Sequence, residues 1–346
     1  MNQWHTFLTS QGAVTSGNEV SDFGDKQAEL MAAANGDIVT DLSHLSLLEL
    51  AGEDAAAFLQ GQVTNDVKQL DGSNSQYAGY CNPKGRMLAL FFAYAHAGNY
   101  YLQLDARLTE NIAKRLRMYV LRSKVVVTDV SEKLVRLGVA GKNAEQVLSQ
   151  QFPQLPQQAH ELAGTESGVV IRLPGSTPRF EVIVGADQAT ALWSQLKQQL
   201  KPVGRDAWEW LEVQAGIPDI VPATQEEFVP QMVNLDMLGG INYKKGCYTG
   251  QEIVARSQYL GKLKRRTALA TVANPAARAG DEVFSMADPG QPCGMVVNAA
   301  PNGLGGADLL VEMKLGALGE DVRHGAAGGP ALDFQHMPYH LDALEL

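Results

Sequence analysis

A chain of 346 residues exceeds the length at which one hydrophobic core stops growing, so the sequence predicts about two or three domains. A formal net charge of −10 argues against a protein that covers duplex nucleic acid, because phosphate neutralisation requires a basic surface. Three cysteines without metal-ligand spacing, no signal-peptide pattern and no apolar run of about 20 residues indicate a soluble, cytoplasmic protein without membrane contact or a metal site.

The first part of the chain predicts an α+β domain. Residues before about 30 show no clean period, and we expect them to lie along the surface or fray. Two apolar segments of strand length follow, and then a helix with acidic residues in its first turn. The next predicted elements are two hairpin arms, a strand, a helix and a β-branched strand, at 77–81, 86–96, 100–104, 108–121 and 125–130.

The middle of the chain repeats this style, and the end changes it. Strands are predicted at 134–139, 169–173 and 180–184, and helices at 143–152, 188–200 and 206–215. Beyond Gly261, short segments separated by Gly and Pro predict a small all-β domain, with strands at 266–272, 282–285, 294–298 and 309–315. The predicted domains are 30–130, 131–260 and 261–346.

The densest chemistry lies in residues 244–252, which read KKGCYTGQE. Lys244 and Lys245 bring positive charge next to the thiol of Cys247, and such charge favours the thiolate. Gly246 and Gly250 allow a positive φ or a close approach of another segment. A reactive or ligating cysteine is the favoured interpretation, and the alternative is a glycine-bounded turn with an inert, buried cysteine.

Basic and aromatic residues offer further candidates, each with an alternative. A basic cluster could attract a polyanion or ligand carboxylates, or be a solvated surface run; it comprises Arg256, Lys262, Lys264, Arg265 and Arg266. Trp208 could stack on a flat heterocycle, although an aromatic residue at helical spacing is more often part of the core. The helix at 108–121 is also basic, so a tRNA- or partner-binding module that uses both basic segments is a third, weaker hypothesis.

The cysteine stretch carries a resemblance to a known family. KGCYTGQE at 245–252, with NLD at 234–236, GGI at 239–241 and Ala-Arg at 255–256, closely resembles the motif of the YgfZ family of folate-binding, tRNA-modifying proteins. That family is related to the glycine-cleavage T-protein, an aminomethyltransferase, and to a mitochondrial iron-sulfur assembly factor. The similarity covers nearly the whole chain, through 60–66, 81–85, 122–127 and 215–218. It implies a T-protein-like three-domain ring, with two interleaved α+β domains around a folate-sized cavity and a C-terminal β-barrel.

The resemblance also implies roles for individual residues. Cys247 would be the working thiolate and Lys245 its electrostatic partner, while Tyr248, Gln251 and Glu252 would position the loop. The ligand would be tetrahydrofolate or a one-carbon derivative, and the residues assigned to it are Trp208, Leu45, Asn65, Asp66 and Arg256. Leu45 stands where the family's second folate-associated tryptophan is expected. We expect Cys247→Ala and Lys245→Ala to leave folding intact and to lower tRNA thiomethylation in cells.

One departure from the T-protein pattern separates the possible functions. T-proteins carry a catalytic aspartate shortly after the hairpin turn, whereas residues 86–90 read RMLAL here. Loss of a general acid or base costs a factor of about 10² to 10⁴, so aminomethyltransferase activity is not expected. The leading hypothesis is a monomeric folate-binding protein that supports iron-sulfur cluster synthesis or repair, with tRNA-thiomethylating enzymes as dependent partners. The alternative is a folate-dependent one-carbon transferase or demethylase that acts on RNA or a small amine.

Overall fold

The structure is a computed structural model that describes residues 3–17, 19–165, 168–259 and 263–341. Contacts within the chain divide it into two compact units. Unit 1 comprises Met1–Phe58, Lys68–Gln76 and Phe92–Leu211, and unit 2 comprises Leu59–Val67, Tyr77–Phe91 and Glu212–Leu346.

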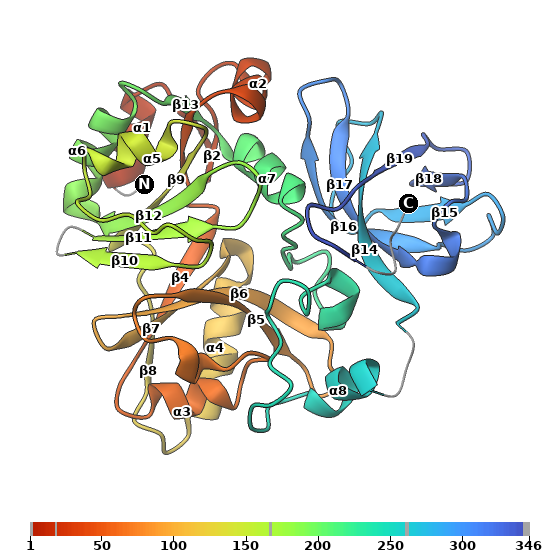
Figure 1. Cartoon of the computed structure of the whole chain (residues 1–346), viewed down its shortest axis with the longest axis horizontal. Helices are drawn as coiled ribbons and strands as arrows, with labels where there is room; N and C mark the ends of the chain where they lie inside the picture. Colours follow the sequence, from red (N-terminus) through yellow and green to blue (C-terminus); the bar gives the residue numbers. More distant parts are fainter. Residues whose placement is uncertain (1–2, 18, 166–167, 260–262, 342–346) are drawn as a thin grey trace. The chain divides into compact units, whose positions relative to one another are not determined.

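Unit 1 contains a six-stranded sheet with the order β10-β11-β12-β9-β3-β13. Its strands are Leu162–Thr165, Gly168–Leu173, Arg179–Gly185, Leu134–Ala140, Ile38–Asp41 and Lys201–Val203. All neighbours are antiparallel except β13 and β3, which pair in parallel. The helices α1 (Gln3–Ser10), α5 (Ala144–Ser149) and α6 (Ala186–Leu196) gather on one side of this sheet and bury a common apolar core against it (Figure 1).

A five-stranded sheet has the order β5-β6-β7-β4-β8. Its strands are Ser75–Cys81, Met87–His96, Asn99–Asp105, Leu45–Ala51 and Val126–Asp129. The helix α3 (Ala55–Gln60) follows β4, and α4 (Thr109–Val120) buries Ile112, Ala113 and Leu116. Because β3 and β9 belong to one sheet and the strands between them to the other, the two sheets are interleaved along the chain, as the sequence predicted.

The last sheet has the order β18-β15-β16-β17-β14-β19 and lies in unit 2. Its strands are Val322–His324, Glu282–Ser285, Gly294–Pro301, Ala307–Lys314, Arg265–Val272 and Leu332–Gln335. A bridge between Arg323 and Ala331 brings the two edge strands together, so the sheet is nearly closed. This confirms the predicted all-β, barrel-like end of the chain. The remaining helices of this part are α7 (Arg205–Gln214), which ends unit 1, and α8 (Gln251–Tyr259).

The N-terminal residues differ from the sequence prediction. They form α1, the hairpin β1-β2 (Val14–Ser16 and Glu19–Asp22) and α2 (Lys26–Asn35). Trp4 and Leu8 are buried, and the Trp4 indole donates a hydrogen bond of 2.7 Å to Asp41. A helix of two turns has little stability alone, so tertiary packing decides that it forms, and local sequence periodicity is a poor guide to it. Among the helices that the structure describes, none is both long and apolar enough to cross a membrane.

Candidate functional site

Two segments that lie far apart in the sequence meet within unit 2. They are residues 60–66, which we call loop 60–66, and residues 239–252, which we call the cysteine loop. Three hydrogen bonds join them, from Thr64 Oγ1 to Gly240 O (2.6 Å), from Asn65 Nδ2 to Gly239 O (2.8 Å) and from Asn242 N to Thr64 O (3.0 Å). Thr64 and Asn65 are buried, so these bonds form away from solvent. The two sequence motifs are therefore one structural site.

Lys245 is the strongest link between the two loops. Its side chain is 9% exposed, and Nζ donates to three carbonyl oxygens, those of Gln60 (2.8 Å), Val63 (2.5 Å) and Asn65 (2.8 Å). An ammonium group has three donors, so all of them are used on loop 60–66. Nζ also lies 5.1 Å from the centre of the Tyr248 ring, within the range of a cation–π contact. Lys245 thus fixes the position of the cysteine loop, and Lys245→Ala would not leave folding intact as the sequence analysis expected.

The surroundings of Lys245 change its protonation. Burial lowers the pKa of its ammonium group to about 8, and the negative charge of Asp66 opposes part of that shift. Lys245 and Asp66, two of the predicted site residues, are therefore electrostatically coupled. Gln60 Nε2 donates to Asp66 Oδ1 at 2.9 Å, which holds that carboxylate within loop 60–66.

This lowered pKa makes the contribution of Lys245 to stability dependent on pH. The folded-state pKa of about 8 lies below the reference value of 10.5, so between these values the folded protein binds fewer protons than the unfolded chain. We expect the difference in unfolding free energy between wild type and Lys245→Met to increase as the pH rises from about 8 and to shrink as it falls through that value. Urea unfolding of both proteins across this range measures it, and a constant difference would contradict the assignment.

Gly250 is the point at which another segment touches the cysteine loop. Its φ is +83°, and a Cβ there would lie 2.5 Å from Asn82 O and 2.9 Å from Gly85 Cα. Asn82 and Gly85 belong to the turn between β5 and β6, so this turn and the cysteine loop meet backbone to backbone. Gly246 has no positive φ, and a Cβ there would meet nothing within 4 Å. Of the two motif glycines, only Gly250 has the conformation and contact predicted for both.

Cys247 lies exposed on the cysteine loop, whereas Cys81 and Cys293 are buried. The alternative of an inert, buried Cys247 therefore does not describe this structure. Tyr248 next to it is buried, and burial first, then the nearby Cys81 and Tyr243, raise the pKa of its phenol. The loop thus alternates inward-facing anchors with an outward-facing thiol.

The predicted positioning residues on α8 point to solvent. Glu252 and Arg256 are 84% and 64% exposed at their side chains, and their charged groups lie 3.9 Å apart, one helical turn from each other. Gln251, at the first position of α8, is half-buried, and its backbone N–H donates to Tyr248 O at 3.2 Å. Exposed pairs of this kind contribute little to stability, so Glu252 and Arg256 are available to a ligand or partner.

A carboxylate that the sequence analysis missed reaches the β5–β6 turn. Glu226 Oε1 accepts a hydrogen bond of 3.0 Å from Asn82 Nδ2, and the backbone N–H of Glu226 donates to Met87 O at 2.8 Å. Glu226 is exposed and has a φ of +67°, which is uncommon for a residue with a side chain. Its only sequence signal is its place in the long connection at 218–242, so the contact could not be predicted.

Trp208, assigned to folate, lies in the core of unit 1. Its side chain is 1% exposed, the Arg179 guanidinium lies 5.5 Å from the ring, and a Cβ on Gly138 would lie 2.6 Å from a ring carbon. This is the core position that was the alternative for Trp208, and stacking on a ligand would require the ring to be uncovered. Leu45, at the start of β4, is half-buried, and its carbonyl accepts a hydrogen bond from buried Arg136.

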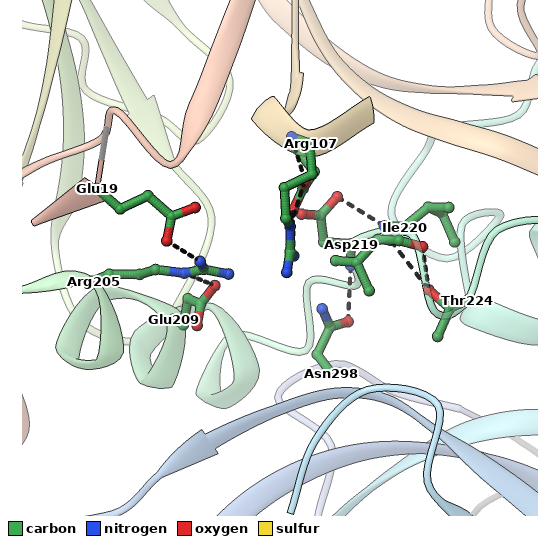
Figure 2. A network of polar contacts seen from close by, with 10 residues as sticks. Glu19, Arg107, Arg205, Glu209, Asp219, Ile220, Thr224 and Asn298 are labelled. Carbon is green, nitrogen blue, oxygen red and sulfur yellow. Dashed lines mark hydrogen bonds and ion pairs between the residues drawn. The ribbon is translucent and has the colours of Figure 1, made fainter. Parts of the chain in front are cut away.

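A charge network surrounds the start of α7, next to Trp208. Arg205 donates to Glu209 at 2.7 Å and to Glu19 at 2.5 Å (Figure 2). Burial opposes the charge of Arg205, yet Glu209 and Glu19 together raise the pKa of its guanidinium. Burial also lowers the pKa of His44 well below its usual value, with Arg205 as the next cause. These groups satisfy one another, so we interpret them as structural.

In unit 2, Figure 2 shows a second set of polar contacts, at the segment after α7. Asn298 Oδ1, from β16, accepts a hydrogen bond of 2.8 Å from Asp219 N, and Asp219 Oδ1 accepts one of 2.8 Å from Ile220 N. These contacts fix the start of the 218–242 connection to the barrel-like sheet. They belong to the same segment that later carries Glu226 and the cysteine loop.

The predicted basic cluster is largely paired within the protein. Arg266 is buried and forms an ion pair of 2.5 Å with Asp236, and Arg265 pairs with the buried Glu312. Lys262 lies outside the described residues, while Lys264 and Arg256 are exposed. The prediction that this cluster attracts a polyanion is therefore wrong for Arg265 and Arg266, because their charges are neutralised internally.

Two further searches find no additional chemistry around these residues. Within the described ranges, no three His, Cys, Asp or Glu side chains gather to hold a metal ion. A cavity of about 240 Å³ in unit 1 is lined by residues that include Tyr94, His96 and Tyr101, and by none of the predicted site residues.

Comparisons with known proteins place this geometry in context. The family described as the GCVT N-terminal domain matches residues 18–242. The tRNA-modifying protein YgfZ of Colwellia psychrerythraea is 33% identical over 240 residues, which are 69% of this chain and 73% of the relative. The protein of the same name from Photorhabdus laumondii is 33% identical over 309 residues, 87% of this chain and 92% of the relative. The glycine cleavage system aminomethyltransferase T from Bartonella henselae has a similar fold, with a TM-score of 0.82, 18% identity and coverage of 98% and 97% of the two chains.

Proposed function

Because this chain belongs to the YgfZ family, within the wider family of GCVT N-terminal domains, we propose that it acts in tRNA modification. In this proposal it binds a reduced folate and supports the synthesis or repair of iron-sulfur clusters. Enzymes that modify tRNA, including those that thiomethylate it, would depend on these clusters. The observation that carries the proposal is the exposed Cys247 on a loop that Lys245 and Gly250 hold in place.

An exposed thiol on a fixed loop suits transient chemistry. An iron-sulfur cluster generally needs four protein ligands, so one cysteine does not enclose a cluster. Cys247 would instead bind an iron or sulfur species briefly, or attack a folate-bound carbon. Lys245 and Tyr248 would act as positioning residues, because both are buried beside the exposed thiol.

The folate part of the proposal rests on family membership. Tetrahydrofolate or a one-carbon derivative is the ligand we propose, with Leu45, Asn65, Asp66 and Arg256 as candidate contacts and Trp208 only if its ring is uncovered. Asn65 is itself bound to Tyr77 O and Gly239 O, so it would act by shaping loop 60–66. Calorimetric titration of the full chain with tetrahydrofolate tests this part directly, and an absence of binding would remove it.

Cys247→Ser tests the central claim. Because Cys247 is exposed, we expect the unfolding free energy to change by less than about 0.5 kcal/mol. We expect tRNA thiomethylation, measured by mass spectrometry of tRNA from cells that carry only the variant, to fall at least about tenfold, as loss of an essential nucleophile or ligand does. Thr249→Ser, a conservative change two residues away, should retain wild-type modification. Normal thiomethylation with Cys247→Ser would refute the role of the thiol.

A one-carbon transferase or demethylase that acts on RNA or a small amine is the second candidate. The contact of Glu226 with Asn82 favours it, because it brings a carboxylate to the turn after which T-proteins carry their catalytic aspartate. In this case Cys247 would be the nucleophile and Glu226 a general acid or base. Incubation with labelled methylenetetrahydrofolate separates the two candidates, since only the transferase moves the label to an acceptor.

A further inference from the structure

The outer face of α4 combines basic and apolar side chains. The helix buries Ile112, Ala113 and Leu116, so the residues between them point outward. Residues 111–128 contain five basic side chains and no acidic one, in a chain of net charge −10; the five are Lys114, Arg115, Arg117, Arg122 and Lys124. A local excess of positive charge of this kind, in an acidic protein, indicates a surface for an anionic partner.

Exposed apolar side chains are concentrated at the same place. Among the described residues, the large hydrophobic side chains that are exposed include four within nine positions, Met118 (67%), Tyr119 (46%), Leu121 (86%) and Val126 (63%). Single exposed apolar residues are common on protein surfaces, but a cluster beside basic residues is typical of an interaction site. We call residues 114–126 the α4 tip.

Leu121 has a conformation that folding alone does not explain. It follows the last residue of α4 with a φ of +48°, a region that favours glycine, and its side chain is 86% exposed. The side chain therefore stabilises neither the turn nor the core. Glycine would be the better residue for folding, so an outward-facing leucine at this position indicates a contact with something outside the chain.

Several charges of the α4 tip are available to a ligand. Lys114 and Arg122 are exposed and form no ion pair with any residue in the described part of the chain. Arg117 uses Nε for Val127 O at 3.0 Å, which leaves the two terminal nitrogens of its guanidinium outward. Arg115 lies 5.8 Å from the centre of the Tyr119 ring, and Lys124 pairs with Glu53 on the surface.

We propose that the α4 tip binds single-stranded RNA, such as a loop of tRNA. The inference rests on the proposed function, which supplies RNA as the partner class. Phosphates would contact Lys114, Arg117 and Arg122, and unpaired bases would pack on Tyr119 and Leu121. This interleaving of positive and aromatic or apolar side chains is the pattern by which proteins bind single strands. An acidic protein partner would use the charges but would have no need of the exposed ring beside them.

Charge reversal on the α4 tip tests the proposal. Binding of purified tRNA to the full chain is measured by fluorescence anisotropy over a range of salt concentrations. For Lys114→Glu combined with Arg122→Glu, we expect affinity to fall at least about tenfold and the salt slope to decrease by about two, one for each lost phosphate contact. Lys142→Glu combined with Lys201→Glu makes the same charge change at exposed positions on other elements, and it should bind tRNA like wild type.

Leu121→Gly tests the apolar contact without a risk to folding, because glycine prefers the φ of this position. We expect weaker tRNA binding by severalfold with an unchanged salt slope, since no charge is removed. Wild-type affinity and slope in the charge-reversed variant would overturn the proposal, as would an equal loss in the control pair. If that variant binds tRNA normally but loses an acidic protein partner, the surface is a protein site and the proposal is equally wrong.

The outcome can be separated from the fate of the proposed function. Cys247→Ser leaves the α4 tip untouched and should bind tRNA like wild type. If tRNA binding depends on the α4 tip while Cys247→Ser leaves thiomethylation normal, the RNA site stands and the thiol chemistry fails. If Cys247→Ser abolishes modification while the charge-reversed protein binds tRNA normally, the reverse holds.

Discussion

Gly250→Ala is expected to destabilise the protein by about 3 kcal/mol, through backbone strain and steric overlap together. Gly250 has a φ of +83°, and the added Cβ would lie 2.5 Å from Asn82 O and 2.9 Å from Gly85 Cα. Both neighbours are backbone atoms, so neither can rotate away, and the cysteine loop must separate from the β5–β6 turn. Urea unfolding measures the loss, and tRNA thiomethylation should fall with it because Cys247 is displaced.

Gly246→Ala is the matched control within the same motif. Gly246 has no positive φ, and a Cβ there would meet nothing within 4 Å, so we expect a change of less than about 0.5 kcal/mol. The two substitutions add the same methyl group four positions apart. Equal effects of both would show that the contact with the β5–β6 turn does not hold the cysteine loop.

Lys245→Met should cost about 3 kcal/mol near neutral pH. The substitution removes a charged donor from three carbonyl oxygens of loop 60–66 and leaves them without a protein partner, at roughly 1–3 kcal/mol for each buried group that water does not reach. The sum is offset in part because the burial cost of the ammonium group also disappears. Urea unfolding gives the total, and amide exchange across residues 60–67 should become faster.

Lys244→Met is the control for this prediction. Lys244 is exposed, and removal of an exposed charge usually changes stability by less than about 0.5 kcal/mol. Lys245→Arg should not restore stability, because a planar guanidinium does not reproduce three bonds that converge on one nitrogen. If Lys244→Met and Lys245→Met have similar effects, the clamp on loop 60–66 is not the reason that Lys245 matters.

These pairs divide the KGCYTGQE motif into two classes of residue. Lys245, Tyr248 and Gly250 hold the loop to loop 60–66 and to the β5–β6 turn, whereas Gly246 and Cys247 face solvent. A loss of function in the first class would therefore reflect loop position as well as chemistry. Only Cys247 combines exposure with reactivity, so its substitution gives the cleaner test of mechanism.

Local patterns predicted much of the fold. In α4, buried residues recur at positions 109, 112, 113 and 116, the spacing of one helix face, and the predicted helix at 108–121 matches Thr109–Val120 closely. The predicted strand at 266–272 corresponds to Arg265–Val272, and the short, glycine-separated strands after it form the barrel-like sheet. Where local pattern was weak, as in α1, prediction failed because burial of Trp4 and Leu8 decides that the helix forms.

By itself, the sequence determined the family, the fold class and the cysteine that carries the chemistry, because motifs and periodicities are local properties. Only the tertiary structure decided what the charged residues do. Lys245 and Arg266 look like free cations in the sequence, yet one binds carbonyls about 180 residues away and the other pairs with Asp236. A charge has no partner until the chain folds, and whether it serves a ligand or the protein depends on which groups the fold brings within hydrogen-bonding distance.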